Sequence, residues 1–172
     1  MVLTNKLFEQ YNIECDRVDI KEGEEIAAKL LKALTNSKTG IGLAAPQIGI
    51  TKRVCVINVK EPIVLINPEI IESDGEFIFK EGCLSYPKKV VPVKRHAMVA
   101  VDADNLDEPL VFDIKKDGTM QHILETACVQ HEIDHLDGIT MFDKKYIRQP
   151  IKAEKKYGRN EKIVIVAKDN TS

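Results

Sequence analysis

The chain has 172 residues, with 25 lysines and arginines against 27 aspartates and glutamates, which gives a formal net charge of −2. This length suits a sizeable core, and we expect residues 1–172 to form one domain. The charge balance excludes the basic surface that is typical of nucleic-acid-binding proteins. The N-terminal stretch lacks the apolar core of a signal peptide, and no apolar run approaches the length of a membrane span. We therefore expect a cytoplasmic protein.

Four cysteines are spread widely along the chain, at Cys15, Cys55, Cys83 and Cys128, and none belongs to a Cys-X-X-Cys pair. This spacing predicts reduced thiols rather than a disulfide framework. Each of the four could still serve as a metal ligand.

The first predicted helix covers residues 22–35, EGEEIAAKLLKALT. Its apolar residues Ile26, Leu30, Leu31 and Leu34 fall on one helical stripe. The acidic first turn suits the positive end of the helix dipole.

Short β-branched and aromatic runs follow from residue 53 to about residue 115. They are RVCVINV, PIVLINPEII, GEFIFKEG, VVPVKRHAMVAVDAD and PLVFDIK. Turn residues such as Asn67-Pro68 and Asp74-Gly75 separate them, so we predict a largely antiparallel set of strands. A last apolar run, KIVIVAK at residues 162–168, predicts an edge strand before a frayed tail at residues 169–172.

A longer helix is predicted between Thr119, a plausible N-cap residue, and Gly138, at the position that commonly follows a helix end. The stripe expected to face the interior consists of Met120, Leu124, Ala127, Cys128, His131 and His135. Strands that precede one long helix predict an α+β fold in which antiparallel strands pack around that central helix.

This helix carries an HExxH pattern, with His131 and His135 one turn apart and Glu132 between them. A lone inward histidine is usually a hydrogen-bonded core residue. Two imidazoles at this spacing can bind one small cation, and the glutamate then lies near the open coordination position, where it can take a proton from bound water. The pattern therefore favours a metal site.

The pattern alone leaves the third protein ligand open. Met141 stands where the metzincin pattern HExxHxxGxxH has its last histidine, and a thioether is a poor replacement for imidazole on zinc. Glu154 lies at a suitable distance for a thermolysin-like carboxylate, but in a short basic stretch that is more typical of a solvated surface. Cys128 shares the histidine face, yet about 10 Å of helix rise separates it from His135. We expect Cys128 to line a pocket beside the metal.

Cys83, in the segment KEGCLSYPKK, is the remaining candidate. Gly82, Ser85 and Pro87 predict an irregular loop that could bring the thiolate against the helix. The alternative is a buried cysteine at the end of a strand.

A third stretch, TGIGLAAPQIG at residues 39–49, is also unusual. It is either a glycine- and alanine-rich loop that allows close packing, with Gln47 in solvent, or a close approach of the backbone to a ligand, with the Gln47 amide directed at it. Spacing does not distinguish the two.

Together, GIGLAAPQ, EGCLS and QHEIDHLDG, in this order, resemble the three signature motifs of peptide deformylases, the metalloenzymes that remove the N-formyl group from nascent polypeptides. The resemblance covers about residues 22–143. It implies a single metallohydrolase domain in which antiparallel strands surround a motif-bearing helix. Residues 1–21 diverge, because they lack the proline and the Leu-Arg pair that are common in this family.

The resemblance also implies a role for each matching residue. The implied metal ligands are Cys83, His131 and His135, with water or hydroxide as the fourth ligand. The implied catalytic groups are Glu132 as general acid and base, and Gln47 with the Leu84 backbone N–H as stabilisers of the oxyanion. The implied substrate contacts are the backbones of Ile41, Gly42 and Gly82, along an extended peptide, and the side chains of Leu124, Ala127 and Cys128, around the methionine side chain.

The implied cofactor is one divalent metal ion per chain, Fe²⁺ or Zn²⁺. One thiolate and two imidazoles suit Zn²⁺, whereas the family often uses Fe²⁺. The implied partners are N-formyl-methionyl peptides and, transiently, the ribosome. No long amphipathic C-terminal helix is present to define a docking mode, and we expect a monomer.

Two other function classes stay open. A metallopeptidase would take a downstream ligand in place of Cys83. A catalytically silent metal-binding or interaction protein would have no need for both Glu132 and Gln47.

Overall fold

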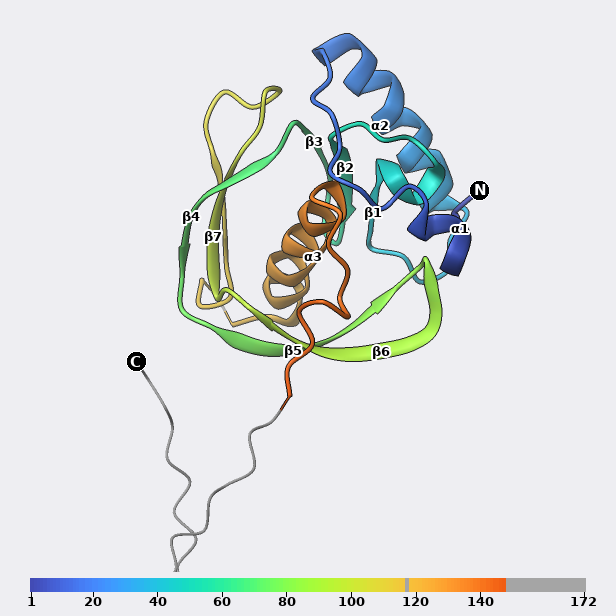
Figure 1. Ribbon diagram of the computed structural model, residues 1–172. Helices are drawn as coiled ribbons and strands as arrows, with labels where there is room; N and C mark the ends of the chain where they lie inside the picture. The colour runs from blue at the N-terminus through green and yellow to red at the C-terminus, as the bar shows by residue number, and fades with distance from the viewer. Residues whose placement is uncertain (117, 148–172) are drawn as a thin grey trace, which may run out of the picture.

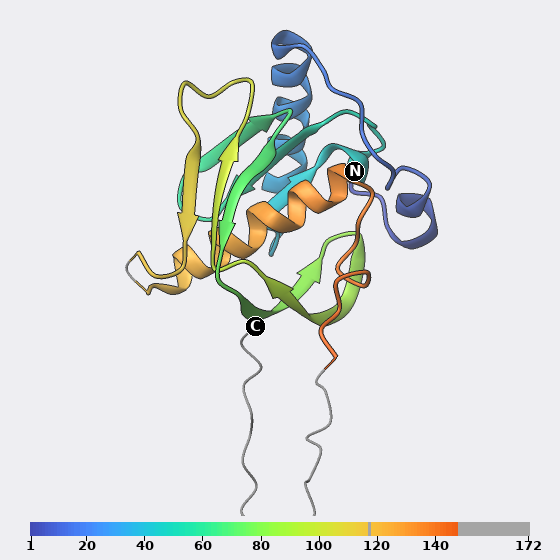
Figure 2. The same cartoon turned by 60° about the vertical axis from the view of Figure 1, so that its left-hand side comes forward.

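The computed structural model describes residues 1–116 and 118–147. Three small antiparallel sheets lie around one long helix, α3 (Figure 1; Figure 2). In chain order the elements are α1 (Asn5–Glu9), α2 (Ile20–Thr35), β1 (Gly42–Ala44), the 3₁₀ helix η1 (Ala45–Ile48), β2 (Val54–Asn58), β3 (Pro62–Ile66), β4 (Glu69–Asp74), β5 (Phe77–Cys83), β6 (Tyr86–Arg95), β7 (Met98–Asp102), β8 (Leu110–Asp113) and α3 (Met120–Leu136). The predicted α+β fold with antiparallel strands around a central helix is confirmed.

The sheets have the strand orders β1-β2-β3, β4-β7-β8 and β5-β6, and every pairing between these strands is antiparallel. Strand β2 is buried on both faces, which explains its continuous apolar run. Val54 and Val56 belong to the cluster formed with α2. Cys55 and Ile57 alternate with them and belong to the cluster formed with α3. The first sheet therefore lies between the two long helices.

Helix α2 begins two residues earlier than predicted. Asp19 caps it, because its side chain accepts a hydrogen bond of 2.9 Å from the Glu22 backbone N–H. The expected stripe is confirmed, since Ile26, Leu30 and Leu34 are all buried. This amphipathic helix covers the outer face of the first sheet.

Helix α3 is capped by Thr119, whose side chain accepts from the His122 backbone N–H, and Gly138 follows it with a φ of +73°. Both expected ends are confirmed. All residues from Glu125 to Leu136 are buried, so this part of the helix has no solvent face. The placement of Met120 on the inward stripe was wrong. Its side chain is 63% exposed, because the first turns of α3 extend beyond the core.

The segment around Cys83 is more regular than the irregular loop that the sequence predicts. Strand β5 runs through Cys83 and β6 starts at Tyr86, so that only Leu84 and Ser85 connect them. The register shifts between Gly82 and Cys83, and Cys83 pairs with Tyr86. This short hairpin fixes the thiol at the end of a strand that contacts α3 through Glu81.

The N-terminal segment is anchored to three other parts of the protein. The backbone N–H of Leu3 donates to the Gln47 carbonyl (2.7 Å), and that of Asn5 donates to the Ser85 carbonyl (2.8 Å). The N–H of Cys15 donates to the carbonyl of Leu136, at the end of α3 (2.8 Å). Residues 1–21 are thus part of the packed structure.

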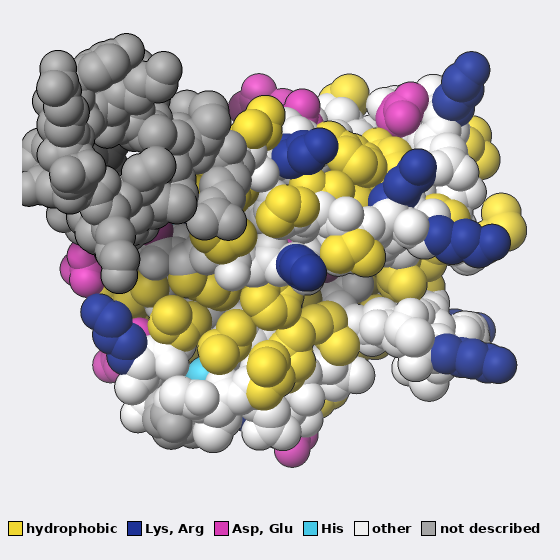
Figure 3. Space-filling view, turned by 90° about the horizontal axis from the view of Figure 1, so that it is seen from below, with side chains coloured by type: hydrophobic (Ala, Val, Ile, Leu, Met, Phe, Trp, Pro, Cys, Tyr) yellow, Lys and Arg dark blue, Asp and Glu magenta, His cyan; other side chains and the backbone are white. Residues whose placement is uncertain are grey.

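No helix in the described part of the chain is long and apolar enough to cross a membrane. All four cysteines are free, as predicted. Seen from below, hydrophobic side chains are spread among lysines and arginines (Figure 3), and exposed hydrophobic residues on β5 and β6 include Ile78 and Val90. The predicted strand at residues 162–168, the tail at 169–172 and Glu154 lie outside the described residues.

Candidate metal centre

Three potential ligand atoms converge beside α3. His131 and His135 project from successive turns of the helix, and their Nε2 atoms lie 3.1 Å apart. Cys83 Sγ, from the end of β5, lies 3.4 Å from His135 Nε2. All three ligand atoms lie within 4.8 Å of one another, in the one such cluster of at least three His, Cys, Asp or Glu residues found among the described residues.

These distances fit a tetrahedral metal ion. Zinc–nitrogen and zinc–sulfur bonds of about 2.0 and about 2.3 Å at the tetrahedral angle place two nitrogens about 3.3 Å apart, and nitrogen and sulfur about 3.5 Å apart. The observed 3.1 and 3.4 Å are close to these values. The two imidazoles and the thiol therefore fit Zn²⁺ or a similar divalent ion with little movement.

A buried network of ion pairs holds His131, the first histidine of the cluster. His131 Nδ1 lies 2.8 Å from the Glu81 carboxylate, which also accepts two hydrogen bonds from Arg95, at 2.6 and 2.8 Å. Arg95 in turn contacts Asp134, which Lys144 also reaches at 2.6 Å. Burial alone would raise the pKa of Glu81, but the hydrogen bonds from Arg95 and His131 outweigh it and lower the pKa to about 2. The ionised carboxylate accepts from Nδ1–H, which leaves Nε2 of His131 available to a metal ion.

The two histidines have opposite pKa shifts. Burial would lower the pKa of His131, but its hydrogen bonds to Cys83 and Glu81 outweigh burial and raise it. Burial and the neighbouring His131 together lower the pKa of His135. A proton on the cluster is therefore held at His131, and a bound metal ion would displace it.

Glu132 follows His131 on α3, and its carboxyl group lies against Gly42 and Cys128. Its side chain is buried, and burial is the main reason that its pKa is raised to about 7. Its Oε2 atom is buried and has no hydrogen-bond partner among the described residues, while Oε1 lies 4.0 Å from Cys128 Sγ. A carboxyl group with a pKa near neutrality can accept and return a proton.

Gln47 is buried rather than solvated, which excludes the expectation that its side chain lies in solvent. Its side chain is held by the Ala44 backbone N–H, which donates to Oε1 at 2.9 Å. The amide nitrogen therefore points the other way, 3.1 Å from Ser85 Oγ and 3.5 Å from Cys83 Sγ. The residue is 1% exposed, so a hydrogen-bond donor is fixed next to the candidate ligand.

The remaining predicted site residues come from the hairpin turn, from β1 and the residue before it, and from α3, and their roles stay predictions. Leu84 follows Cys83 in the hairpin turn and is half-buried, whereas Gly82 is exposed. Ile41 precedes β1, and its carbonyl accepts from the Asn58 N–H at 2.7 Å and from Cys128 Sγ at 3.5 Å. On α3, Ala127 and Cys128 are buried and Leu124 is half-buried.

The two other candidates for the third ligand within the described residues, Met141 and Cys128, do not join the cluster. Met141 is 1% exposed and packs in a hydrophobic group with Phe8, Tyr86 and Val93. Cys128 points to Ile41 and Glu132 instead of the histidines, as its helix position predicts.

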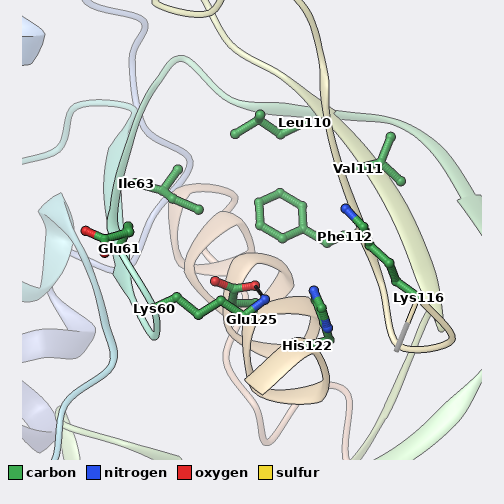
Figure 4. A pocket seen from close by; sticks show the side chains of 9 residues that line it. All are labelled: Lys60, Glu61, Ile63, Leu110, Val111, Phe112, Lys116, His122 and Glu125. Atoms are coloured by element: carbon green, nitrogen blue, oxygen red, sulfur yellow. Dashed lines mark ion pairs between the residues drawn. The ribbon is translucent and has the colours of Figure 1, made fainter. Parts of the chain in front are cut away.

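A separate shallow cavity of about 260 Å³ lies at the N-terminal half of α3 (Figure 4). Lys60 and Glu125 form an ion pair of 3.1 Å at this cavity, and Phe112 forms part of its wall. Neither the three potential ligands nor Leu124, Ala127 or Cys128 lines it. It is distinct from the predicted methionine pocket.

Sequence reasoning missed two residues that hold the ligands, Glu81 and Asn12. Strand alternation could have pointed to Glu81, because residues 81 and 83 of a strand share one face. Asn12 belongs to the divergent segment and carried no signal. Its Oδ1 lies 3.2 Å from His135 Nδ1.

The fold and this cluster are those of an HExxH metalloenzyme. A family model for polypeptide deformylase matches residues 1–152. The peptide deformylase of Desulfitobacterium hafniense is 45% identical over 131 residues, which cover 74% of this chain and 83% of the relative. The peptide deformylase of Dictyoglomus thermophilum is 39% identical over 142 residues, which cover 82% of this chain and 87% of the relative. The crystal structure of peptide deformylase from Thermotoga maritima aligns with a TM-score of 0.71 and 26% identity over 86% of this chain and 97% of that one. The chain belongs to the polypeptide deformylase family.

Proposed function

We propose that this protein removes the N-formyl group from the formyl-methionine of newly made polypeptides. The observation that carries the proposal is the convergence of Cys83 Sγ with Nε2 of His131 and His135. Thiolate ligation from an upstream hairpin distinguishes this arrangement from HExxH peptidases with a downstream ligand. The buried Glu132 and the fixed amide of Gln47 add the parts that a catalytically silent metal protein would not need.

The chemistry follows from the positions of these groups. A formamide is an unreactive acyl group, and a divalent ion held by the three ligands supplies Lewis-acid activation of water and of the formyl oxygen. Glu132 accepts the proton of the attacking water and passes it to the departing amine, for which a pKa of about 7 is well suited. The Gln47 amide and the Leu84 N–H stabilise the negative charge that develops on the formyl oxygen.

In this proposal the substrate binds along the edge strand of the first sheet. Strand β1 pairs with β2 on one side and is the edge strand of its sheet. An extended peptide can add to such an edge through backbone hydrogen bonds, here with Ile41 and Gly42, and reach Gly82 on the other side. Leu124, Ala127 and Cys128 contact the methionine side chain, which requires local opening because Ala127 and Cys128 are buried.

The proposal extends to the setting of the enzyme. The metal is Fe²⁺ or Zn²⁺, both of which suit this donor set. We place the enzyme in the cytoplasm, where formylated chains are made, as a single-domain monomer with transient access to the ribosome.

A substrate comparison tests the reaction. Iron-, nickel- and zinc-loaded protein is incubated with formyl-Met-Ala, acetyl-Met-Ala and Met-Ala, and formate and free amines are measured. Equal amounts of formate and Met-Ala from the formylated peptide alone support the proposal. Cleavage of the Met-Ala bond would identify a peptidase, and no formate with any of the three metals would reject the deformylase reaction.

A further inference from the structure

The side chain of Asn12 connects the N-terminal segment to the second histidine of the cluster. Its Nδ2 donates to the Gly138 carbonyl at 2.8 Å. Its Oδ1 lies 3.2 Å from His135 Nδ1. Because the amide nitrogen is taken by a carbonyl, the oxygen is the group that faces the imidazole, and it can only accept a hydrogen bond there.

This orientation fixes the tautomer of the ring. When Nδ1 of His135 carries the proton that Asn12 accepts, Nε2 keeps its lone pair. That Nε2 is the atom 3.1 Å from His131 Nε2 and 3.4 Å from Cys83 Sγ. The lone pair is therefore available where the three potential ligand atoms meet. The backbone of Ile139 also contacts the ring by a hydrogen bond, so that Asn12 shares this role.

A second residue of the same segment holds the plane of the ring. Phe8 is fully buried and packs edge-on against His135, with ring centroids 5.1 Å apart and an interplanar angle of 84°. Two residues after Asn12, Glu14 pairs with Asp137 in an isolated antiparallel bridge. The Cys15 N–H donates to Leu136, one residue beyond His135. Asn12 is thus held against the end of α3 from both sides along the chain.

The other histidine, His131, is also oriented by a hydrogen-bond acceptor, but this acceptor is a carboxylate. Glu81 accepts from His131 as a charged carboxylate within an ion-pair network. Asn12 is neutral, so it can orient His135 without adding a second negative charge beside the thiolate. Partners of this kind orient ligating histidines and commonly change metal affinity by about 10- to 100-fold.

We propose that Asn12 is a positioning residue for the metal centre, which acts by accepting the Nδ1–H of His135 and so directing Nε2 to the metal. This inference rests on the metal site proposed above, but not on the reaction. It assigns a function to a residue of the N-terminal segment, for which the sequence motifs predict no role.

Two variants separate the acceptor from the rest of the side chain. Asn12→Leu and Asn12→Asp both lose the donation to Gly138, but only aspartate keeps an oxygen for His135. Gln10→Ala, at an exposed position two residues earlier, is the matched control. Zinc affinity is measured by competition with a chelator. The His135 Nδ1–H signal of the zinc-loaded protein is followed by NMR with ¹⁵N-labelled histidine.

Zinc affinity is expected to fall about 10- to 100-fold in Asn12→Leu, while Asn12→Asp and Gln10→Ala stay within about threefold of the unmodified protein. The Nδ1–H signal should persist in Asn12→Asp and exchange rapidly with water in Asn12→Leu. An unchanged affinity in Asn12→Leu overturns the inference. So does an equal loss in Asn12→Asp, which would assign the effect to the Gly138 contact.

These readouts are independent of turnover. If zinc affinity follows the expected order but no formate is released, the proposed reaction fails and the role of Asn12 stands. If formate is released but affinity does not follow that order, only the role of Asn12 fails.

Discussion

Gly42 lies directly against Glu132. A Cβ atom added at position 42 would meet Glu132 Oε1 and Cys128 Sγ, each at 2.5 Å. No real Cβ contact is this short, so the backbone of β1 can pass the proposed proton carrier only where the side chain is absent.

Gly42→Ala should therefore push the Glu132 carboxylate away from the ligand cluster. We expect kcat for deformylation to fall about 100-fold, the lower end of what general acid–base catalysis contributes, with little change in zinc affinity. Gly23→Ala is the control, because its Cβ would crowd Ile66 far from the cluster. That variant should lose stability but keep kcat, and an equal fall of kcat in both variants would contradict the prediction.

Glu132 and Cys83 should separate catalysis from metal binding. Glu132→Ala removes the proton carrier but no ligand, so it should bind zinc normally and lose about 10²- to 10⁴-fold in kcat. Cys83→Ala should lose zinc, as measured by metal content after dialysis. Normal zinc content in Cys83→Ala would show that the third ligand has been assigned incorrectly.

Gln47 should affect the rate alone. Gln47→Ala removes one donor to the developing oxyanion, and such a loss typically costs about 10²- to 10³-fold in kcat. Ser85→Ala removes a contact of the Gln47 amide but keeps the amide itself, so its effect on kcat should be smaller. A larger effect of Ser85→Ala would mean that the serine, not the glutamine, is the main contributor.

Arg95→Met should destabilise the fold strongly. Arg95 is 2% exposed and pairs with the buried carboxylates of Glu81 and Asp134, which the substitution would leave without their cation. We expect the free energy of unfolding of the metal-free protein in urea to fall by about 3–5 kcal/mol. Arg17→Met removes an arginine paired with Glu69 and Asp104 at exposed positions and should cost less than about 1 kcal/mol. Similar losses of unfolding free energy in Arg95→Met and Arg17→Met would contradict the prediction that the buried ion pairs contribute more.

Thiol labelling should report on metal binding. Burial raises the pKa of Cys15 to about 11, and it raises the pKa values of Cys55 and Cys128 as well. The thiolate is the reactive form, and at pH 8 a thiol with a pKa of 11 is only about 0.1% ionised. A maleimide should therefore modify only Cys83 in the folded metal-free protein, and bound zinc should prevent it.

The pH dependence provides the check on this labelling. Reaction at Cys15 should become measurable only as the pH rises toward 11, since deprotonation must come first. Peptide mapping by mass spectrometry identifies the modified residue, and rapid labelling of Cys55 or Cys128 at pH 8 would contradict their burial.

The sequence was sufficient for much of the fold, because its signals there are local. Spacing of Ile26, Leu30 and Leu34 identifies α2, and Thr119 and Gly138 mark the ends of α3. Periodicity does not show where the core ends, however. For that reason Met120 was placed inside although the first turns of α3 lie beyond the sheets.

Within the candidate site, only residues that lie in sequence motifs could be predicted. Gln47, Cys83 and the HExxH residues lie in recognisable stretches, and the structure brings them together. Glu81 lies in one of these stretches, but no motif marks its pairing with Arg95, fourteen residues later, or with His131, fifty residues later. Asn12 is further still from its partner, 123 residues along the chain. Long-range pairing of polar groups has no period that one sequence can reveal.

The burial of α3 on every side from Glu125 to Leu136 has a consequence for how this protein can change over time. Twelve consecutive positions serve the core, and the two proposed histidine ligands and the proton carrier lie within that same run. A mutation in this run that changes catalysis also changes the packing of the core. Stability and activity therefore cannot change independently there. Variation is left to elements such as α2, whose outer face is in water, and to the loops. Substitutions are therefore most restricted in α3 and least restricted on the surface around it.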